Sequence, residues 1–151
     1  MSYTQILIHY VFRTKRSARY LQKPHFERMQ KIISGICMNL GVRLHAYGGI
    51  QDHIHLLLEQ PAHLAVSEIA AKLKANSSRA MNKNQLPGRR FSWSRRYGAF
   101  SVSPGNVKQV RMYIQNQEEH HRKLTSAEEF QLFLQKCGLK SIREMRHGED
   151  D

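Results

Sequence analysis

The sequence predicts an α+β domain built on one antiparallel sheet. Two patterns carry this prediction. Strand-like stretches rich in β-branched and aromatic residues occur at 3–12, 42–50, 53–59 and 97–103. Apolar residues at the helical spacing of three and four follow the first and the third of these stretches. The resulting order, β-α-β-β-α-β followed by one or two helices, is the ferredoxin-like split βαβ arrangement, with helices on one face of the sheet.

Start and stop signals bound the first elements. The first strand leaves through the basic run 13–16, and Pro24 suits the first turn of a helix that Gly41 ends. A short turn at Gln51 and Asp52 makes the next two strands a hairpin. Ser67 offers an N-cap to the second helix, which a polar loop follows at 82–90.

The remaining elements follow the fourth strand. The segment 104–106, Pro-Gly-Asn, ends that strand and starts a helix that carries Tyr113 and Gln117. A last helix begins at Thr125 or Ser126, where Ser126 and Glu129 form a capping pattern. We expect one domain over residues 1–139 and a charged, mobile tail over 140–151.

Composition narrows the functional class. Lys and Arg number 24 against 12 Asp and Glu, which gives a net charge of +12. A compact domain this basic usually has a polyanionic partner. No apolar run approaches the length of about 18 residues that spans a membrane, and we expect no signal peptide. Two isolated cysteines, Cys37 and Cys137, indicate reduced thiols and a cytoplasmic location. The chain has no GxxxxGK[ST], GxGxxG or CxxC, which argues against nucleotide-fuelled chemistry and thiolate zinc sites.

The positive charge is concentrated in one part of the chain. No acidic residue occurs between Glu68 and Glu118, and aromatic residues at 91, 93, 97 and 100 are interleaved with the cations there. Cations neutralise phosphates and aromatic rings stack on unpaired bases, so this stretch predicts nucleic-acid binding, although each cation alone could belong to a solvated face. The candidate DNA-binding residues are Lys72, Lys74, Arg79, Arg89, Arg90, Arg95 and Arg96.

Two histidines and a tyrosine are candidates for chemistry. His53 and His55 alternate in a strand, so both imidazoles should share one face and form a two-ligand metal platform. Strand histidines are also often hydrogen-bonded without a metal. Tyr113 and Gln117 share a helix face, although a tyrosine there could simply pack with its hydroxyl in water. Asp52 could orient a ligand or could be only a turn residue.

Together these blocks resemble the small HUH-type single-tyrosine transposases of bacterial insertion sequences, the insertion-sequence-200 and -605 group with its repeat-associated relatives. The resemblance covers nearly the whole chain. It is carried by HYVFRTKRS at 9–17, GGIQDHIHLLLEQP at 48–61, the helix at 72–74, WSRRYGAFSVS at 93–103 and YIQNQEEHHRK at 113–123. The histidine-hydrophobic-histidine motif then falls on 53–55, the nucleophile on Tyr113 and the third metal-ligand position on Gln117.

The resemblance implies cleavage of single-stranded DNA by attack of the tyrosine on phosphorus, which leaves a 5′-phosphotyrosine and a free 3′-OH. It also implies Mg²⁺ or Mn²⁺ as cofactor, hairpin-forming DNA ends as substrate and a homodimer as the active unit. A phenol with a pKa of ~10 is a poor nucleophile at neutral pH, and a cation that polarises the phosphate compensates for this. His120 and His121 are candidates for phosphate contacts or proton transfer rather than metal ligands.

Two alternatives remain at this point. A non-catalytic ferredoxin-like nucleic-acid module would explain the charge and the aromatic residues, but it would place aromatic residues on the central strands where this chain has histidines. A domesticated repeat-processing relative, or a nickase of the replication-initiator type, would keep the chemistry and change its role.

Overall fold

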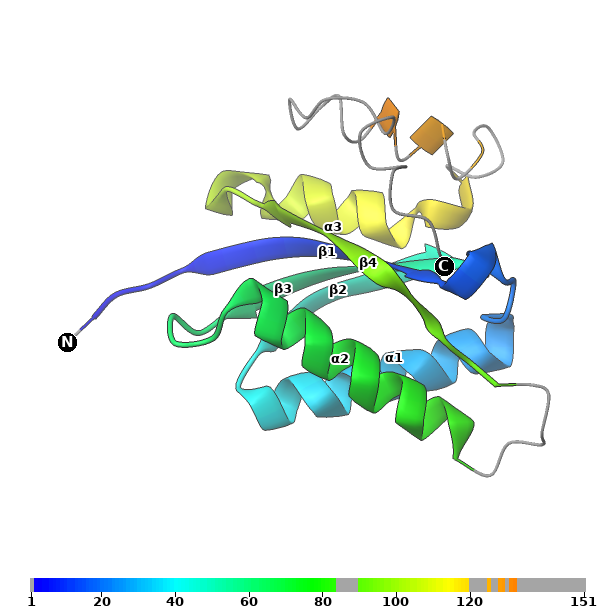
Figure 1. The fold of residues 1–151 in the computed structure, drawn as a ribbon. Helices are drawn as coiled ribbons and strands as arrows, with labels where there is room; N and C mark the ends of the chain where they lie inside the picture. Colours follow the sequence, from blue (N-terminus) through cyan, green and yellow to red (C-terminus); the bar gives the residue numbers. More distant parts are fainter. Residues whose placement is uncertain (1, 84–89, 120–124, 126–127, 130, 133–151) are drawn as a thin grey trace.

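A four-stranded antiparallel sheet forms the centre of the molecule in the computed structural model (Figure 1). The model describes residues 2–83, 90–119, 125, 128, 129, 131 and 132. Its strands are β1 (Ile6–Thr14), β2 (Arg43–Ile50), β3 (His53–Gln60) and β4 (Trp93–Ser101), and they lie in the order β2-β3-β1-β4. This order confirms the predicted ferredoxin-like α+β fold.

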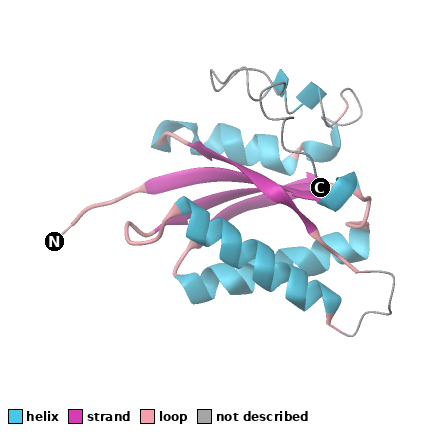
Figure 2. Ribbon diagram, in the orientation of Figure 1, coloured by secondary structure: helices cyan, strands magenta, loops and turns pink. Residues whose placement is uncertain are grey.

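Helices cover both faces of the sheet. The helices α1 (Lys23–Leu40) and α2 (Val66–Asn82) lie on one face, and α3 (Val107–Gln115) lies over the other (Figures 1 and 2). The added helix therefore lies on the face of the sheet opposite α1 and α2. Two short 3-10 segments, η1 (Lys15–Ser17) and η2 (Pro104–Asn106), precede α1 and α3. No helix among the described residues is long and apolar enough to cross a membrane.

The alternation of side chains along the central strands separates a packed core from a polar face. Ile54, Leu56 and Leu58 of β3 belong to the main core beneath the sheet, where α1 and α2 pack. The residues that alternate with these, namely His53, His55 and Leu57, face the opposite side of the sheet, because successive strand side chains point to opposite faces. The main core needs only one side of β3, so the other side is available for a functional site.

The structure differs from the predicted elements at three places. The first strand spans Ile6–Thr14 rather than residues 3–12. The fourth strand begins at Trp93 rather than at residue 97, because Trp93 pairs with Thr14 across a register shift in β1. Helix α2 begins at Val66 with Ala65 as its N-cap and without a side-chain capping bond, so the prediction of Ser67 as N-cap is wrong.

Several sequence-based predictions lie outside the described residues. They concern Arg89, the histidines at 120 and 121, the cap at Ser126, the end of the last helix and the tail over 140–151. At the start of that last helix, the Thr125 hydroxyl accepts a hydrogen bond of 3.2 Å from the backbone N–H of Glu128. This contact is typical of an N-cap.

Candidate functional site

The two strand histidines lie side by side on the α3 face of the sheet. His53 is 6% exposed and His55 is 3% exposed, and their ring centroids are 5.1 Å apart. The predicted shared face is therefore present. Because buried imidazoles need partners for their ring nitrogens, the groups around them determine which nitrogen can bind a ligand.

Each histidine is held through its Nδ1 atom. The Nδ1 of His53 lies 2.7 Å from the carboxylate of Asp52, and the Nδ1 of His55 lies 2.9 Å from the Nε2 of His9. Metal-binding histidines are typically fixed in this way by a second group on the nitrogen that does not bind the metal. Asp52 thus occupies the orienting position that the sequence analysis suggested for it, and the buried His9 supplies the equivalent contact for His55.

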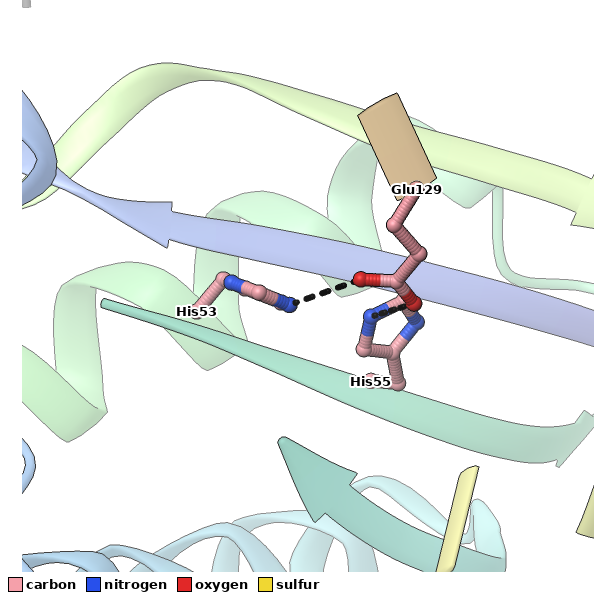
Figure 3. Close-up of side chains that lie close together, drawn as sticks. All are labelled: His53, His55 and Glu129. Atoms are coloured by element: carbon pink, nitrogen blue, oxygen red, sulfur yellow. Dashed lines mark ion pairs between the residues drawn. The ribbon is translucent and has the colours of Figure 1, made fainter. Parts of the chain in front are cut away.

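The Nε2 atoms of both histidines face the carboxylate of Glu129. The Nε2 of His53 lies 3.7 Å from Oε2 and the Nε2 of His55 lies 3.9 Å from Oε1 (Figure 3). One ligand atom from each of these three residues lies within 4.8 Å of the others. Two imidazole nitrogens and a carboxylate oxygen converging in this way form a candidate site for a divalent cation.

Tyr113 lies at the edge of this cluster. Its hydroxyl donates a hydrogen bond to Oε1 of Glu129, and its ring centroid lies 5.7 Å from that of His55. The ring is also 6.2 Å from His9. The predicted nucleophile and the predicted metal platform are therefore neighbours within one chain.

Gln117, the predicted third ligand, is placed against the tyrosine backbone. Its Nε2 donates a hydrogen bond of 3.2 Å to the carbonyl of Tyr113. The side chain is 1% exposed, and its Oε1 has no hydrogen-bond partner among the described residues. An unsatisfied buried amide oxygen costs free energy, so a cation or a donor nearby would stabilise it.

The charge of the site is set by its carboxylates. Burial disfavours the protonated form of His53, but hydrogen bonds to Asp52 and Glu129, and their charges, outweigh burial and raise the pKa of His53 to about 9. Burial lowers the pKa of His9 to about 4, although the charge of Glu129 acts in the opposite direction. His9 is therefore neutral at pH 7. His53 carries a proton there, which a bound cation would displace.

Helix α3 reaches the sheet because β2 has a glycine beneath it. A Cβ at Gly48 would lie 1.9 Å from the backbone oxygen of Ile114, which is a steric overlap with main chain. Ile114 is fully buried against Leu57 and Ala46, and Tyr113 packs against this small cluster. The close approach at Gly48 therefore sets the height of Tyr113 above the histidines.

We expect Gly48→Ala to lower the free energy of unfolding by about 1–3 kcal/mol, because α3 must move to admit the methyl group. Gly35→Ala in α1 is the matched control, since nothing lies within 4 Å of its Cβ position. Urea denaturation measures both variants, and hydrogen exchange over residues 107–115 reports whether α3 is displaced. Equal stability of the parent and Gly48→Ala would contradict the close approach.

The candidate DNA-binding cations are not equivalent. Lys72, Arg79, Arg90, Arg95 and Arg96 are exposed. Lys74 instead ties α2 to β4, because its Nζ donates a hydrogen bond of 2.9 Å to the carbonyl of Arg95.

The aromatic residues interleaved with these cations differ in exposure. Phe91 is 1% exposed and Trp93 is 8% exposed, and both belong to the main core, so neither is an open stacking surface as the sequence pattern suggested. Tyr97 is 39% exposed, and the Lys74 ammonium lies 5.8 Å from the centre of its ring.

Comparison with known proteins decides the family. A family model described as "Transposase IS200 like" matches residues 2–117. The chain belongs to this transposase family. The resemblance stated from the sequence blocks is thereby confirmed, and a role for the chain as a transposase follows from its membership. A search of curated proteins found no match.

Two solved structures share the fold of this IS200-like chain. A putative transposase from Deinococcus radiodurans R1 is 24% identical with a TM-score of 0.63, and the match covers 77% of this chain and 93% of that one. A REP-associated tyrosine transposase bound to a REP hairpin is 14% identical with a TM-score of 0.61, and the match covers 82% of this chain and 73% of that one.

Sequence reasoning missed two residues of the cluster. His9 lies on the first strand and alternates with the core residues Tyr10 and Phe12, a signal that could have placed it on the histidine face. Glu129 had no such signal beyond its place in a capping pattern. Its position opposite the histidines depends on how the chain returns after α3.

Proposed function

We propose that this chain cleaves and rejoins single-stranded DNA through a 5′-phosphotyrosine on Tyr113. The observation that carries the proposal is the convergence of two imidazole nitrogens and a carboxylate beside the Tyr113 hydroxyl. A partly buried tyrosine next to a candidate cation-binding cluster, in a strongly basic chain, fits attack on a phosphodiester.

The donor set suits a divalent cation, and we propose Mg²⁺ or Mn²⁺. His53 and His55 would supply their Nε2 atoms, since both Nδ1 atoms are engaged elsewhere. Glu129 and the buried oxygen of Gln117 are the candidate oxygen ligands. A bound cation would polarise the scissile phosphate and neutralise the charge that develops on it.

Two residues of the chain take part directly in the reaction: Tyr113 forms the new bond to phosphorus, and Glu129 accepts the proton. The Tyr113 oxygen attacks phosphorus and the bond from phosphorus to the 3′ oxygen breaks. The strand downstream of the cut stays attached to the tyrosine through its 5′ phosphate. The phenol proton passes to Glu129, whose carboxylate already accepts the hydrogen bond from the hydroxyl. The leaving 3′ oxygen takes up a proton from water to become a free 3′-OH. In the reverse direction a 3′-OH attacks the phosphotyrosine and joins a new DNA end.

We expect Glu129→Gln to slow cleavage by about 10²–10⁴-fold, because the amide keeps the shape of the side chain but neither accepts the proton nor carries charge. Gln117→Ala should have a milder effect that higher Mn²⁺ concentration partly restores, since it removes one neutral oxygen. Single-turnover cleavage at several Mn²⁺ concentrations measures both. A Glu129→Gln variant as fast as the parent would remove Glu129 from the mechanism.

The DNA partner we propose is a single strand with hairpin-forming element ends. Exposed cations lie on α2 and on the edge strand β4, and a solved structure of similar fold is bound to a REP hairpin. The test is incubation of the chain with such an oligonucleotide and Mg²⁺ or Mn²⁺, followed by a denaturing gel for a covalent protein–DNA adduct. A fully paired duplex is the control. An adduct with the single strand alone supports the proposal, and equal cutting of both contradicts it.

We further propose that the active unit is a homodimer. β4 lies at an edge of the sheet and could pair with a second copy across a two-fold axis, which would protect its open edge. Gly105, in η2 ahead of α3, offers a hinge that would let the tyrosine helix dock on either chain.

Mixing two inactive variants tests whether sites form between chains. A Tyr113→Phe chain and a His53→Ala chain are each expected to be inactive alone. If the tyrosine of one chain serves the histidines of the other, mixed dimers regain cleavage at one composite site. No rescue in mixed dimers verified by mass would mean that each chain uses its own tyrosine, as the neighbouring rings of Tyr113 and His55 permit.

A further inference from the structure

A cavity lies where β1 ends, outside the cluster of His53, His55 and Glu129. Its volume is about 310 Å³, and its lining includes Thr14, Lys15, Arg16, Tyr20, Arg90 and Phe91. Three of these residues are cations, and Lys15, Arg16 and Arg90 are exposed. Phe91 forms a buried part of the wall, at 1% exposure. The cavity therefore combines positive charge at its opening with aromatic groups inside.

The backbone around the cavity is built in an unusual conformation. Arg16 and Ser17 both have φ near +56°, a left-handed geometry that side-chain-bearing residues rarely adopt. The turn is fixed by hydrogen bonds from the Thr14 hydroxyl to the carbonyl of Ala18 and from the Lys15 N–H to the carbonyl of Ser92. Strained backbone held in this way is typical of ligand-binding segments.

The hydroxyl of Tyr20, one of the lining residues, has no hydrogen-bond partner among the described residues. The ring of Tyr20 stacks on His25 at a centroid distance of 4.9 Å and meets Phe91 edge-on at 5.0 Å, so the ring itself is already packed. The hydroxyl is also buried. Burying a hydroxyl without a partner is unfavourable, so a ligand that hydrogen-bonds to it would be stabilised.

The cavity lies at the end of the sheet where His53 begins β3. The backbone N–H of Thr14 donates a hydrogen bond of 2.9 Å to the carbonyl of Asp52, and the carboxylate of Asp52 holds His53. Arg13, the residue before Thr14, is the strand partner of His53. The residues that line the cavity and the residues that hold His53 therefore lie at the same end of the sheet.

We propose that this cavity binds one unpaired base of the DNA strand, at a nucleotide close to the cleaved phosphate. Lys15, Arg16 and Arg90 would contact the sugar-phosphate backbone at the opening, and the Tyr20 hydroxyl would hydrogen-bond to the edge of the base. Contact with a base edge distinguishes bases, whereas contact with phosphate does not, so the cavity would contribute sequence preference near the cut. This inference rests on the proposed function for its DNA strand, but its binding test does not require cleavage.

The single tryptophan of the chain provides the readout. Trp93 packs against Phe91 with ring centroids 4.7 Å apart, so a ligand in the cavity should change its fluorescence. A Tyr113→Phe protein in EDTA, with neither nucleophile nor metal, is titrated separately with dAMP, dCMP, dGMP and dTMP. Deoxyribose 5-phosphate and inorganic phosphate are titrated in parallel. We expect at least one nucleotide to bind about tenfold or more tightly than deoxyribose 5-phosphate.

Variants separate base contacts from phosphate contacts. Tyr20→Phe should weaken the preferred nucleotide by about fivefold and leave deoxyribose 5-phosphate unchanged, because only a hydrogen bond to the base is lost. Arg16→Gln, at an exposed position that need not affect folding, should weaken both ligands. Lys31→Gln, which removes an exposed cation from α1, is the charge-matched control and should change neither. Equal binding of all six probes, or no saturable signal from any nucleotide, would overturn the base-binding proposal.

The position of the base is tested on any single strand that the parent protein cleaves. Abasic substitutions are scanned across the strand, and one within about two nucleotides of the cut should slow cleavage by the parent about tenfold. The same abasic substitution should slow cleavage by the Tyr20→Phe protein less, because that protein has already lost the hydrogen bond to the base. Abasic profiles that are the same for the two proteins would place the base elsewhere. If the parent cleaves no single strand, the proposed function fails, and the nucleotide titrations still decide whether the cavity binds a base.

Discussion

Tyr113→Phe is expected to abolish DNA cleavage and covalent attachment, with a loss of at least about a thousandfold, because it removes the phenol oxygen proposed as the attacking atom. Folding and DNA binding should be nearly unchanged, since the substitution removes only one oxygen and its hydrogen bond to Glu129. The measurement is a denaturing gel with labelled single-stranded DNA and Mg²⁺ or Mn²⁺, alongside a binding titration under the same conditions.

Tyr3→Phe is the matched control, because Tyr3 is 89% exposed and lies outside the cluster. It should cleave as the parent does. A covalent adduct formed by the Tyr113→Phe protein would exclude Tyr113 as the nucleophile, and peptide mapping of that adduct would identify the residue that replaces it.

His53→Ala and His55→Ala are expected to remove metal-dependent cleavage, because each deletes an imidazole nitrogen from the proposed cation site. Excess EDTA should inactivate the parent in the same way. His9→Gln should have a smaller effect, of about 10–100-fold in metal affinity or activity, since His9 orients His55 through a hydrogen bond. Mn²⁺ titration calorimetry and single-turnover cleavage measure the two quantities separately.

His63→Ala provides the control for loss of a histidine, because His63 is exposed on the loop after β3. It should bind Mn²⁺ and cleave as the parent does. Full activity of the parent in EDTA would contradict the metal assignment and leave the histidines with a different role.

Most of the fold could be predicted from the sequence because its signals are local. Pro24 and Gly41 lie at the two ends of α1, and Gly41 adopts the left-handed conformation, with φ of 69°, that ends the helix. The hairpin of β2 and β3 turns at residues 51 and 52 as predicted. Strand β4 was predicted too short because its first half contains Ser94, Arg95 and Arg96, which do not have the composition of a strand.

The site was only partly predictable for a different reason. His53 and His55 are two residues apart in a strand and therefore share a face, so their proximity could be predicted from the sequence. Glu129 reaches them from a segment that is distant in the chain. Gln117 lies just beyond the end of α3 and donates its hydrogen bond to the Tyr113 carbonyl. Contacts of this kind depend on the path of the chain between elements, and periodicity contains no information about that path.

The two faces of the sheet have different consequences for how this family can evolve. The residues that hold the fold together lie mainly beneath the sheet with α1 and α2, whereas His53, His55 and Tyr113 lie above it. Substitutions in the upper set should therefore cost little folding free energy, and a copy of the chain could lose catalysis while it keeps its shape and its basic edge. Loss of transposition would then leave a stable basic domain, available for a new role in its host, only a few substitutions away from the parent chain.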